Sequence, residues 1–253
     1  MQIEFLGAYG GCTNSNNLTS FLVDGCLAID AGCLTQTLSL KRQTQLSDII
    51  ISHTHLDHTL SLPFLADNLF GMKSHPLRIW STPHVIQALR THIFNEDIWP
   101  DFSLLPSVEE PTIRFCPFEA ETCNQIGNYE ITAIRVNHSV PCTGFLISDK
   151  TSSIIFTSDT CTTDRIWEVA NQCSNLKAVI VDCSFPNSMT DLGVTSGHMT
   201  PNLLAADLKK LKKDCPVLVY HLKPQFQDIM IQELTALGDP RLEWDIQSSI
   251  RTF

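Results

Sequence analysis

Three histidines and one aspartate fall within the six residues from His53 to His58, which read His-Thr-His-Leu-Asp-His. Imidazole nitrogen and carboxylate oxygen suit zinc, manganese or iron, whereas magnesium and calcium sites are built from oxygen and need few histidines. A histidine-rich surface loop is the alternative. It fits poorly, because five of the nine histidines belong to the candidate set developed below. The segment therefore predicts a site for divalent metal ions.

Further candidates follow short apolar runs that are typical of buried strands. His53 follows 49–51, His138 follows 131–136, Asp159 follows 154–156, Asp182 follows 179–181 and His221 follows 217–220. In layered α/β proteins, loops beyond the strand ends gather side chains from distant sequence positions into one crevice. We therefore expect five strands to deliver polar groups to one place.

Other elements complete an α/β pattern. The Asp24-Gly25 turn signal between two apolar runs predicts an opening β-hairpin. A Thr200-Pro201 pair is typical of a helix start, with threonine as N-cap and proline at the first helical position. The expected strands are 2–6, 20–23, 27–29 and 241–246, and the expected helices are 83–95, 201–211 and 225–237.

The composition is that of an ordinary globular protein, with 43% hydrophobic and 17% charged residues among 253. A single domain over residues 1–253 is the simplest organisation at this length. The formal charge of −10 opposes binding to a nucleic-acid polymer, which relies on Lys and Arg to neutralise phosphates. The N-terminus lacks a basic segment followed by an apolar one, and no run approaches the roughly 20 apolar residues of a membrane span. We expect a cytoplasmic protein without membrane contact.

The pattern His53, His55, Asp57 and His58 resembles the H-x-H-x-D-H signature of the metallo-β-lactamase superfamily. The resemblance implies an α/β fold, a four-layer αβ/βα sandwich with the site at one edge. It also implies two divalent ions, zinc first, with manganese or iron as alternatives. The implied ligands are His53, His55 and His138 for one ion, Asp57, His58 and His221 for the other, and Asp159 bridging both.

Flanking segments are similar to the class II 3′,5′-cyclic-nucleotide phosphodiesterases of that superfamily, and the similarity spans nearly the whole chain. The segments are 17–20, 51–57, 92–101, 184–187, 197–201 and 221–224. The resemblance implies hydrolysis of cyclic AMP or cyclic GMP to nucleoside 5′-monophosphates, a small-molecule substrate. It also suggests a homodimer in which the loop around Trp99 could complete the pocket.

The mechanism expected from this resemblance uses a metal-bridging hydroxide as the nucleophile, which Asp57 both helps to bind and orients. His198 is the candidate general acid for the leaving O3′, and Asp182 is the carboxylate that would hold it. Local capping roles are the alternative for both residues. Asp182 also stands where many relatives carry glutamate. Asn17 and Thr19 are candidate substrate contacts on resemblance alone.

Three other functions compete with this hypothesis. A transfer-RNA 3′-end endonuclease would share the ligand set, but the sequence shows no basic insertion for RNA. A glyoxalase-like thioesterase would leave the segment 197–201 without a purpose. A non-enzymatic metal-binding module is the third, although structural zinc sites are usually closed and rich in cysteine. The ten cysteines here are scattered and contain no Cys-x-x-Cys pair.

Overall fold

The computed structural model describes residues 1–253, and two seven-stranded mixed sheets form its centre. The first sheet has the order β14-β1-β2-β3-β4-β5-β6 and the second β13-β12-β11-β10-β9-β8-β7. The strands of the first sheet are β1 (Gln2–Gly7), β2 (Ser20–Val23), β3 (Leu27–Ile29), β4 (Asp48–Ile50), β5 (Leu77–Ser81), β6 (Ile113–Pro117) and β14 (Ile250–Thr252). Those of the second are β7 (Cys123–Ile126), β8 (Tyr129–Arg135), β9 (Thr143–Ser148), β10 (Ser153–Phe156), β11 (Leu176–Asp182), β12 (Val217–Tyr220) and β13 (Leu242–Glu243).

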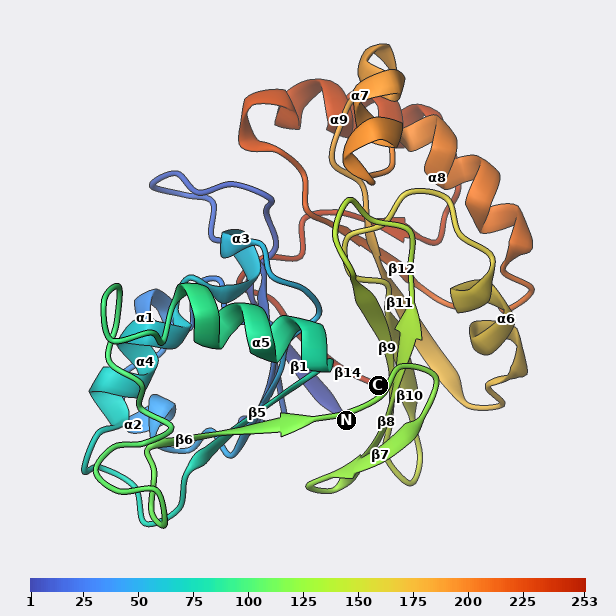
Figure 1. Ribbon diagram of the computed structural model, residues 1–253. Helices are drawn as coiled ribbons and strands as arrows, with labels where there is room; N and C mark the ends of the chain where they lie inside the picture. The colour runs from blue at the N-terminus through green and yellow to red at the C-terminus, as the bar shows by residue number, and fades with distance from the viewer.

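Helices cover the outer face of each sheet (Figure 1). On the first sheet lie α1 (Leu34–Thr37), α2 (Leu40–Gln43), α3 (Leu56–Thr59), α4 (Leu62–Leu69) and α5 (Pro83–His92). On the second lie α6 (Arg165–Gln172), α8 (Pro201–Asp207) and α9 (Gln227–Ala236), and α7 (Thr190–Ser196) lies beyond the strand ends, at the top of Figure 1. Three short 3₁₀ turns occur at Asn187–Met189, Leu208–Lys210 and Pro224–Phe226. The termini lie side by side, because β14 pairs with β1.

Three hydrophobic clusters separate the four layers. One cluster of 22 buried residues fills the space between the two sheets, and two others, of 22 and 20, lie between each sheet and its helices. The alternation of side chains along a strand produces this arrangement. Ile154 and Phe156 of β10 face the other sheet, whereas Ile155 between them faces the helices. The expected αβ/βα sandwich is confirmed.

Most strands and helix starts expected from the sequence are present. The opening hairpin turns at Asp24 and Gly25, both with positive φ, and Thr200 caps α8 by accepting a hydrogen bond from Leu203 N. The helix expected over 83–95 ends at His92, and the strand expected over 241–246 is only Leu242–Glu243. No helix combines the length and the hydrophobicity needed to cross a membrane.

The strand ends at one edge of the two sheets position the site. Strands β3 to β6 are parallel to one another, as are β10 to β13. The ends of β4, β8, β10, β11 and β12 carry the candidates from the sequence: Asp182 is the last residue of β11, and the others follow their strands. The expectation that five strand ends supply one place is therefore met, with one strand from the first sheet and four from the second.

Candidate metal centre

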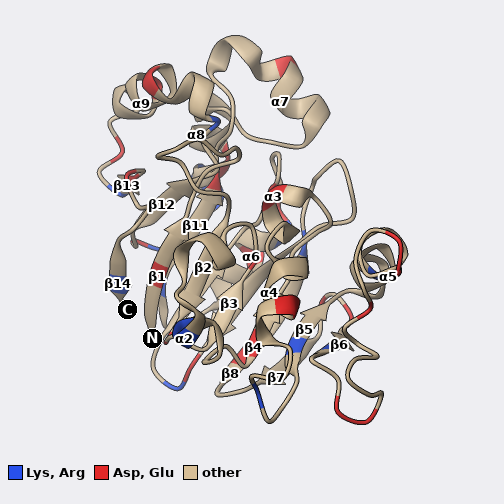
Figure 2. Cartoon of the chain, turned by 90° about the vertical axis from the view of Figure 1, so that its left-hand side faces the viewer, with Lys and Arg blue, Asp and Glu red and all other residues tan.

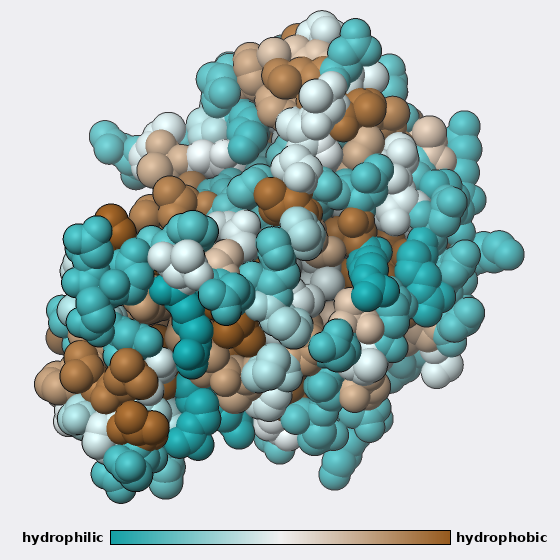
Figure 3. Space-filling model, in the orientation of Figure 1, coloured by the Kyte–Doolittle hydropathy of each residue, from teal (hydrophilic) through white to brown (hydrophobic).

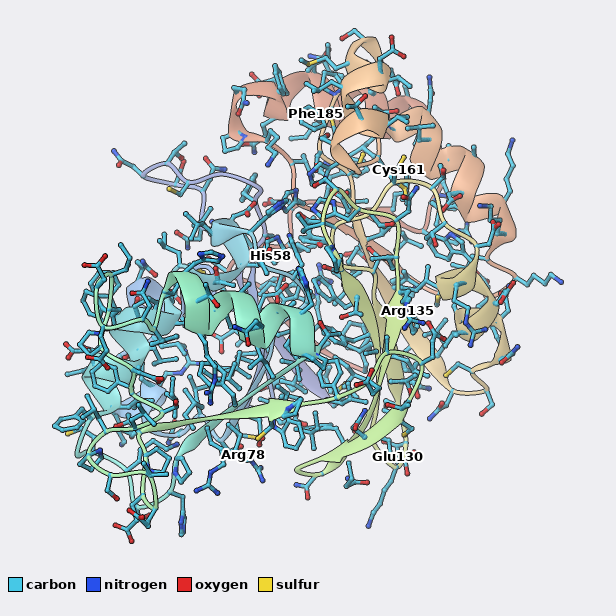
Figure 4. All side chains as sticks on the ribbon, in the orientation of Figure 1. His58, Arg78, Glu130, Arg135, Cys161 and Phe185 are labelled. Carbon is cyan, nitrogen blue, oxygen red and sulfur yellow. The ribbon has the colours of Figure 1, made fainter.

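The histidine-rich segment joins β4 to the single turn of α3. His53 is fully buried, and His55 precedes α3 as its N-cap in an extended conformation. Asp57 and His58 lie in the helical turn that follows. Because an extended stretch is followed at once by a helical one, side chains close in sequence converge: the rings of His53 and His58 are 4.2 Å apart, centroid to centroid. Figure 4 shows His58 below α3, between the two halves of the molecule.

Asp30 and Ser52 hold two of these histidines from behind. The Asp30 carboxylate accepts from Ser52 N and Ser52 Oγ, each at 2.8 Å, and lies 2.7 Å from His58 Nδ1. Ser52 Oγ also lies 3.0 Å from His53 Nδ1. Both rings therefore turn their Nε2 atoms into the site. The sequence reasoning missed Asp30, although it follows the apolar strand β3 as the other candidates follow theirs.

His138 is held by the loop after α7. Its Nδ1–H donates to the carbonyl of Gly197 at 2.9 Å, and its Nε2 lies 3.2 Å from His55 Nδ1. Gly197 ends α7 with φ +77°, and a Cβ there would lie 2.7 Å from His138 Cα. Glycine is therefore required at this position both for its backbone conformation and for the close approach of His138.

Asp159 lies at the centre of the cluster. Its Oδ1 accepts from the Tyr220 hydroxyl at 3.0 Å. Its Oδ2 lies 3.2 Å from His58 Nε2, 3.2 Å from His221 Nε2 and 3.7 Å from His53 Nε2. His221 Nε2 is also 3.1 Å from Asp57 Oδ2. A single carboxylate oxygen thus faces histidines from both predicted ligand sets.

The arrangement fits metal ions on both geometry and hydrogen bonding. Three groups have ligand atoms within 4.8 Å of one another, and all share Asp159: one adds His53, His55 and His138, one adds Asp57, His58 and His221, and one adds Asp182, His198 and His221. Among the seven predicted ligands, three buried atoms have no hydrogen-bond partner, namely His53 Nε2, His58 Nε2 and Asp159 Oδ2. Buried polar atoms are rarely left unpaired in proteins, so all three point to a bound cation. The structure thus brings together all seven residues expected to bind metal.

Electrostatics prepare these groups for cations. Burial lowers the pKa of His53 well below its ordinary value, so the ring is neutral. Burial opposes ionisation of Asp159, but His221 and His58 outweigh it and hold its pKa well below the ordinary value. The pKa of Asp57 is also lowered, because His58 and His221 overcome the effect of burial. Burial disfavours the charged form of His58, but Asp159 and Asp30 overcome it and raise its pKa well above the ordinary value. Neutral imidazoles and ionised carboxylates are the forms that bind metal, so His53, Asp57 and Asp159 are ready for a cation, whereas His58 must release a proton when it binds one.

His198 and Asp182 lie at the edge of this cluster. His198 Nδ1 is 3.0 Å from Asp182 Oδ2, and the His198 ring stacks on His221 at 5.0 Å between centroids. Burial disfavours the charged ring, yet the Asp182 carboxylate overcomes it and raises the pKa of His198 above its ordinary value. The backbone N–H of Thr160 donates to Asp182 Oδ2 at 3.3 Å. Although the side chain of Asp182 is shorter than that of glutamate, it reaches His198 directly.

Asn17 and Thr19 lie on the segment that leads into β2. The Asn17 side-chain amide donates to the Leu6 carbonyl at 3.1 Å, and its backbone N–H donates to the Gln247 side chain. Thr19 is fully buried, and its Oγ1 has no hydrogen-bond partner. Their role as substrate contacts stays a prediction.

Fold and site together define a class of protein. The structure superposes on the metallo-β-lactamase fold protein YhfI from Bacillus subtilis with a TM-score of 0.80, over 99% of both chains at 18% identity. It superposes equally well on unliganded yeast PDE1, with a TM-score of 0.80 over 98% of both chains at 21% identity. The protein therefore has the metallo-β-lactamase fold, and its histidines and aspartates gather in that fold as a candidate divalent-metal site.

The family is narrower than the fold. Residues 31–233 match the model of the class-II cAMP phosphodiesterases. The chain is also 26% identical to a probable 3′,5′-cyclic-nucleotide phosphodiesterase of Yersinia pestis. The alignment spans 302 positions and covers 96% of this chain and 86% of that protein. The chain belongs to the class-II cAMP phosphodiesterase family, as the flanking segments predicted, and is an enzyme of that phosphodiesterase class.

Proposed function

We propose that this protein hydrolyses 3′,5′-cyclic nucleotides to nucleoside 5′-monophosphates at a site that holds two divalent ions. The observation that carries the proposal is the pair of ligand groups that share Asp159, with His198 and its carboxylate partner beside them. Family membership supplies the substrate class. The metal ions at these ligand groups would bind the phosphate, and His198 with Asp182 would supply a proton donor for the leaving group.

The ligand residues divide between two positions. His53, His55 and His138 would hold one ion and Asp57, His58 and His221 the other, with Asp159 between them. When bound, such a pair of ions withdraws charge from phosphoryl oxygens and lowers the pKa of water. We propose zinc as the first choice, because histidine and carboxylate ligands suit it.

The chain's own residues supply orientation and a proton. A water oxygen forms the new bond to phosphorus as the P–O3′ bond breaks, and Asp57 accepts a hydrogen bond from that water and orients it. The water releases one proton to solvent in this step, and His198 is later reprotonated from solvent. The departing O3′ is a poor leaving group unless it is protonated. His198, kept protonated by Asp182, donates that proton. The products are a free 3′-hydroxyl and a 5′-phosphate.

The charge distribution supports a small substrate over a polymer. The chain has 27 acidic residues against 17 Lys and Arg, and Figure 2 shows the basic residues scattered over separate elements. A protein that binds RNA gathers Lys and Arg along one surface to neutralise successive phosphates. A single cyclic phosphate needs only the metal centre.

Exposed apolar side chains next to the metal-binding segment support the proposed homodimer. Leu56, Phe64 and Ile98 are 61%, 50% and 64% exposed. Trp99 packs edge-on against Phe64 at 5.0 Å between ring centroids. Figure 3 shows hydrophobic residues at the surface of this half of the molecule. The molar mass from light scattering, for the protein and for Phe64→Asp, tests the dimer.

The decisive experiment measures turnover of cyclic AMP, cyclic GMP and bis(p-nitrophenyl) phosphate by zinc- or manganese-loaded protein and by Asp159→Ala. Rapid formation of 5′-AMP or 5′-GMP that is lost in the variant is the expected result. Turnover of the aryl diester alone would keep the metal chemistry and reject the substrate. No turnover with full metal occupancy would reject the proposal.

Chelation separates an enzyme from a structural metal module. A catalytic centre at the edge of two packed sheets should lose activity on chelation while the far-ultraviolet circular dichroism spectrum persists. Unfolding on metal removal would instead favour the structural role.

A further inference from the structure

A buried serine links the proposed proton donor to a proposed metal ligand. Ser184 follows β11 and is fully buried. Its Oγ lies 2.6 Å from Asp182 Oδ1, 2.8 Å from His221 Nδ1 and 3.1 Å from His198 Nδ1. We infer that Ser184 is a positioning residue that fixes both rings at once and so couples the metal centre to the proton donor. The inference rests on the function proposed above and adds to it.

The hydrogen-bonding capacity of the Ser184 hydroxyl determines the tautomer of His221 and matches the tautomer that Asp182 favours at His198. A serine hydroxyl has one proton to donate and two lone pairs to accept with. The ionised Asp182 can only accept, and its contact with Ser184 is the shortest, so the hydroxyl proton goes there. The two lone pairs then accept from the Nδ1–H groups of His198 and His221. Both rings are therefore protonated at Nδ1.

The two tautomers have different consequences. At His221 the protonated Nδ1 leaves the lone pair on Nε2, which faces Asp57 Oδ2 at 3.1 Å and Asp159 Oδ2 at 3.2 Å, where a cation would lie. At His198 the proton available for transfer is the one on Nε2, because Nδ1–H is occupied by Ser184 and Asp182. One hydroxyl thus orients a ligand on one ring and a donor on the other.

Asp182 reaches His221 only through this serine. Its Oδ1 is 3.6 Å from His221 Nδ1, beyond a good hydrogen bond, whereas its Oδ2 contacts His198 directly at 3.0 Å. Outer hydrogen bonds of this kind fix the orientation of a metal-binding histidine and raise its basicity. Loss of the Ser184 hydroxyl should therefore remove the link between His221 and Asp182, and should disturb the His198 ring, which loses its contact with Ser184 and stacks on His221.

The first sheet supplies a matched control. Ser52 occupies a similar position between a carboxylate and a histidine. Its Oγ lies 2.8 Å from Asp30 Oδ2 and 3.0 Å from His53 Nδ1. It contacts a proposed metal ligand but has no hydrogen bond to His198. Ser52→Ala therefore removes the same chemical group behind the metal centre and leaves the proposed proton donor in place.

The experiment compares wild type, Ser184→Ala and Ser52→Ala by zinc affinity in chelator competition and by turnover of two substrates at saturating zinc. Both variants should bind zinc about 10- to 100-fold more weakly. Only Ser184→Ala should lose at least about tenfold more turnover of cyclic AMP than of bis(p-nitrophenyl) phosphate, because p-nitrophenolate leaves without a proton. Unchanged zinc affinity, or equal losses on the two substrates, in Ser184→Ala would overturn the inference.

A measurement on the wild-type protein does not depend on how the variants fold. Long-range proton–nitrogen correlation spectra of the zinc-loaded enzyme report which nitrogen of each histidine carries the proton. Nδ1 protonation at His198 and His221 is expected, and an Nε2–H tautomer at His221 would refute the inference. Correct tautomers without cyclic-nucleotide turnover would leave the role of Ser184 standing and reject the proposed function instead.

Discussion

Replacing Gly197 with alanine should damage the metal centre through backbone strain and a steric clash with His138. The residue has φ +77°, and left-handed backbone costs an alanine about 1–2 kcal/mol. The new Cβ would also lie 2.7 Å from His138 Cα and 2.8 Å from both His138 Nδ1 and Ser139 N. Such overpacking adds about 1–3 kcal/mol, so the total loss of unfolding free energy should be about 2–5 kcal/mol.

Gly238 provides the comparison. It has φ +65° at the end of α9, but no heavy atom lies within 4 Å of the Cβ that alanine would add. Gly238→Ala should therefore cost only the conformational term of about 1–2 kcal/mol and should leave the site intact.

Urea denaturation of the metal-free proteins measures the two costs, and chelator competition measures zinc binding. Gly197→Ala should bind zinc about 10- to 100-fold more weakly, because the Gly197 carbonyl orients His138. Equal destabilisation in the two variants, together with unchanged zinc affinity in Gly197→Ala, would refute this account of the loop.

Three further changes probe the core, the support of the ligands and a buried thiol. Phe21→Ala should lower the unfolding free energy by about 3–5 kcal/mol in urea, because Phe21 is fully buried against Phe5 at 5.0 Å and Phe156 at 5.5 Å between centroids. Asp30→Asn should weaken zinc binding about 10- to 100-fold in chelator competition, and an unchanged affinity would show that His58 needs no carboxylate behind it. Burial raises the pKa of the Cys33 thiol from 9.0 to about 11, so the unfolded chain loses that proton first. Stability should fall by up to about 1.4 kcal/mol per pH unit between pH 9 and 11 on this account. Cys33→Ala should show a shallower decline over the same range of the denaturation curves.

The sequence predicted the layers and the ligand residues well because both leave strong local signals. Five apolar runs indicate strands, and each is followed within three residues by a histidine or an aspartate that could bind metal or carry a proton. Where a strand's side chains alternate, as in β10, the pattern also predicts which face is buried.

Contacts between distant segments were beyond sequence reasoning. Strand β14 is short, and it is stabilised by pairing with β1 at the other end of the chain. The predicted strand over 241–246 is largely irregular, since only Leu242 and Glu243 pair with β12. Asp30 had the same signal as the other candidates, but its role depends on His58, which is 28 residues away. Ser184 is an ordinary residue type, and only its three contacts make it notable.

The proposed hydrolysis of cyclic nucleotides to 5′-monophosphates can be tested by following the reaction of cyclic AMP in water labelled with heavy oxygen. Phosphorus NMR and mass spectrometry of the product identify both the bond that breaks and the destination of the label. We expect the metal-loaded enzyme to form 5′-AMP with the label in its phosphate, and Asp159→Ala to form none. Formation of 3′-AMP, or turnover that persists in Asp159→Ala, would contradict this expectation.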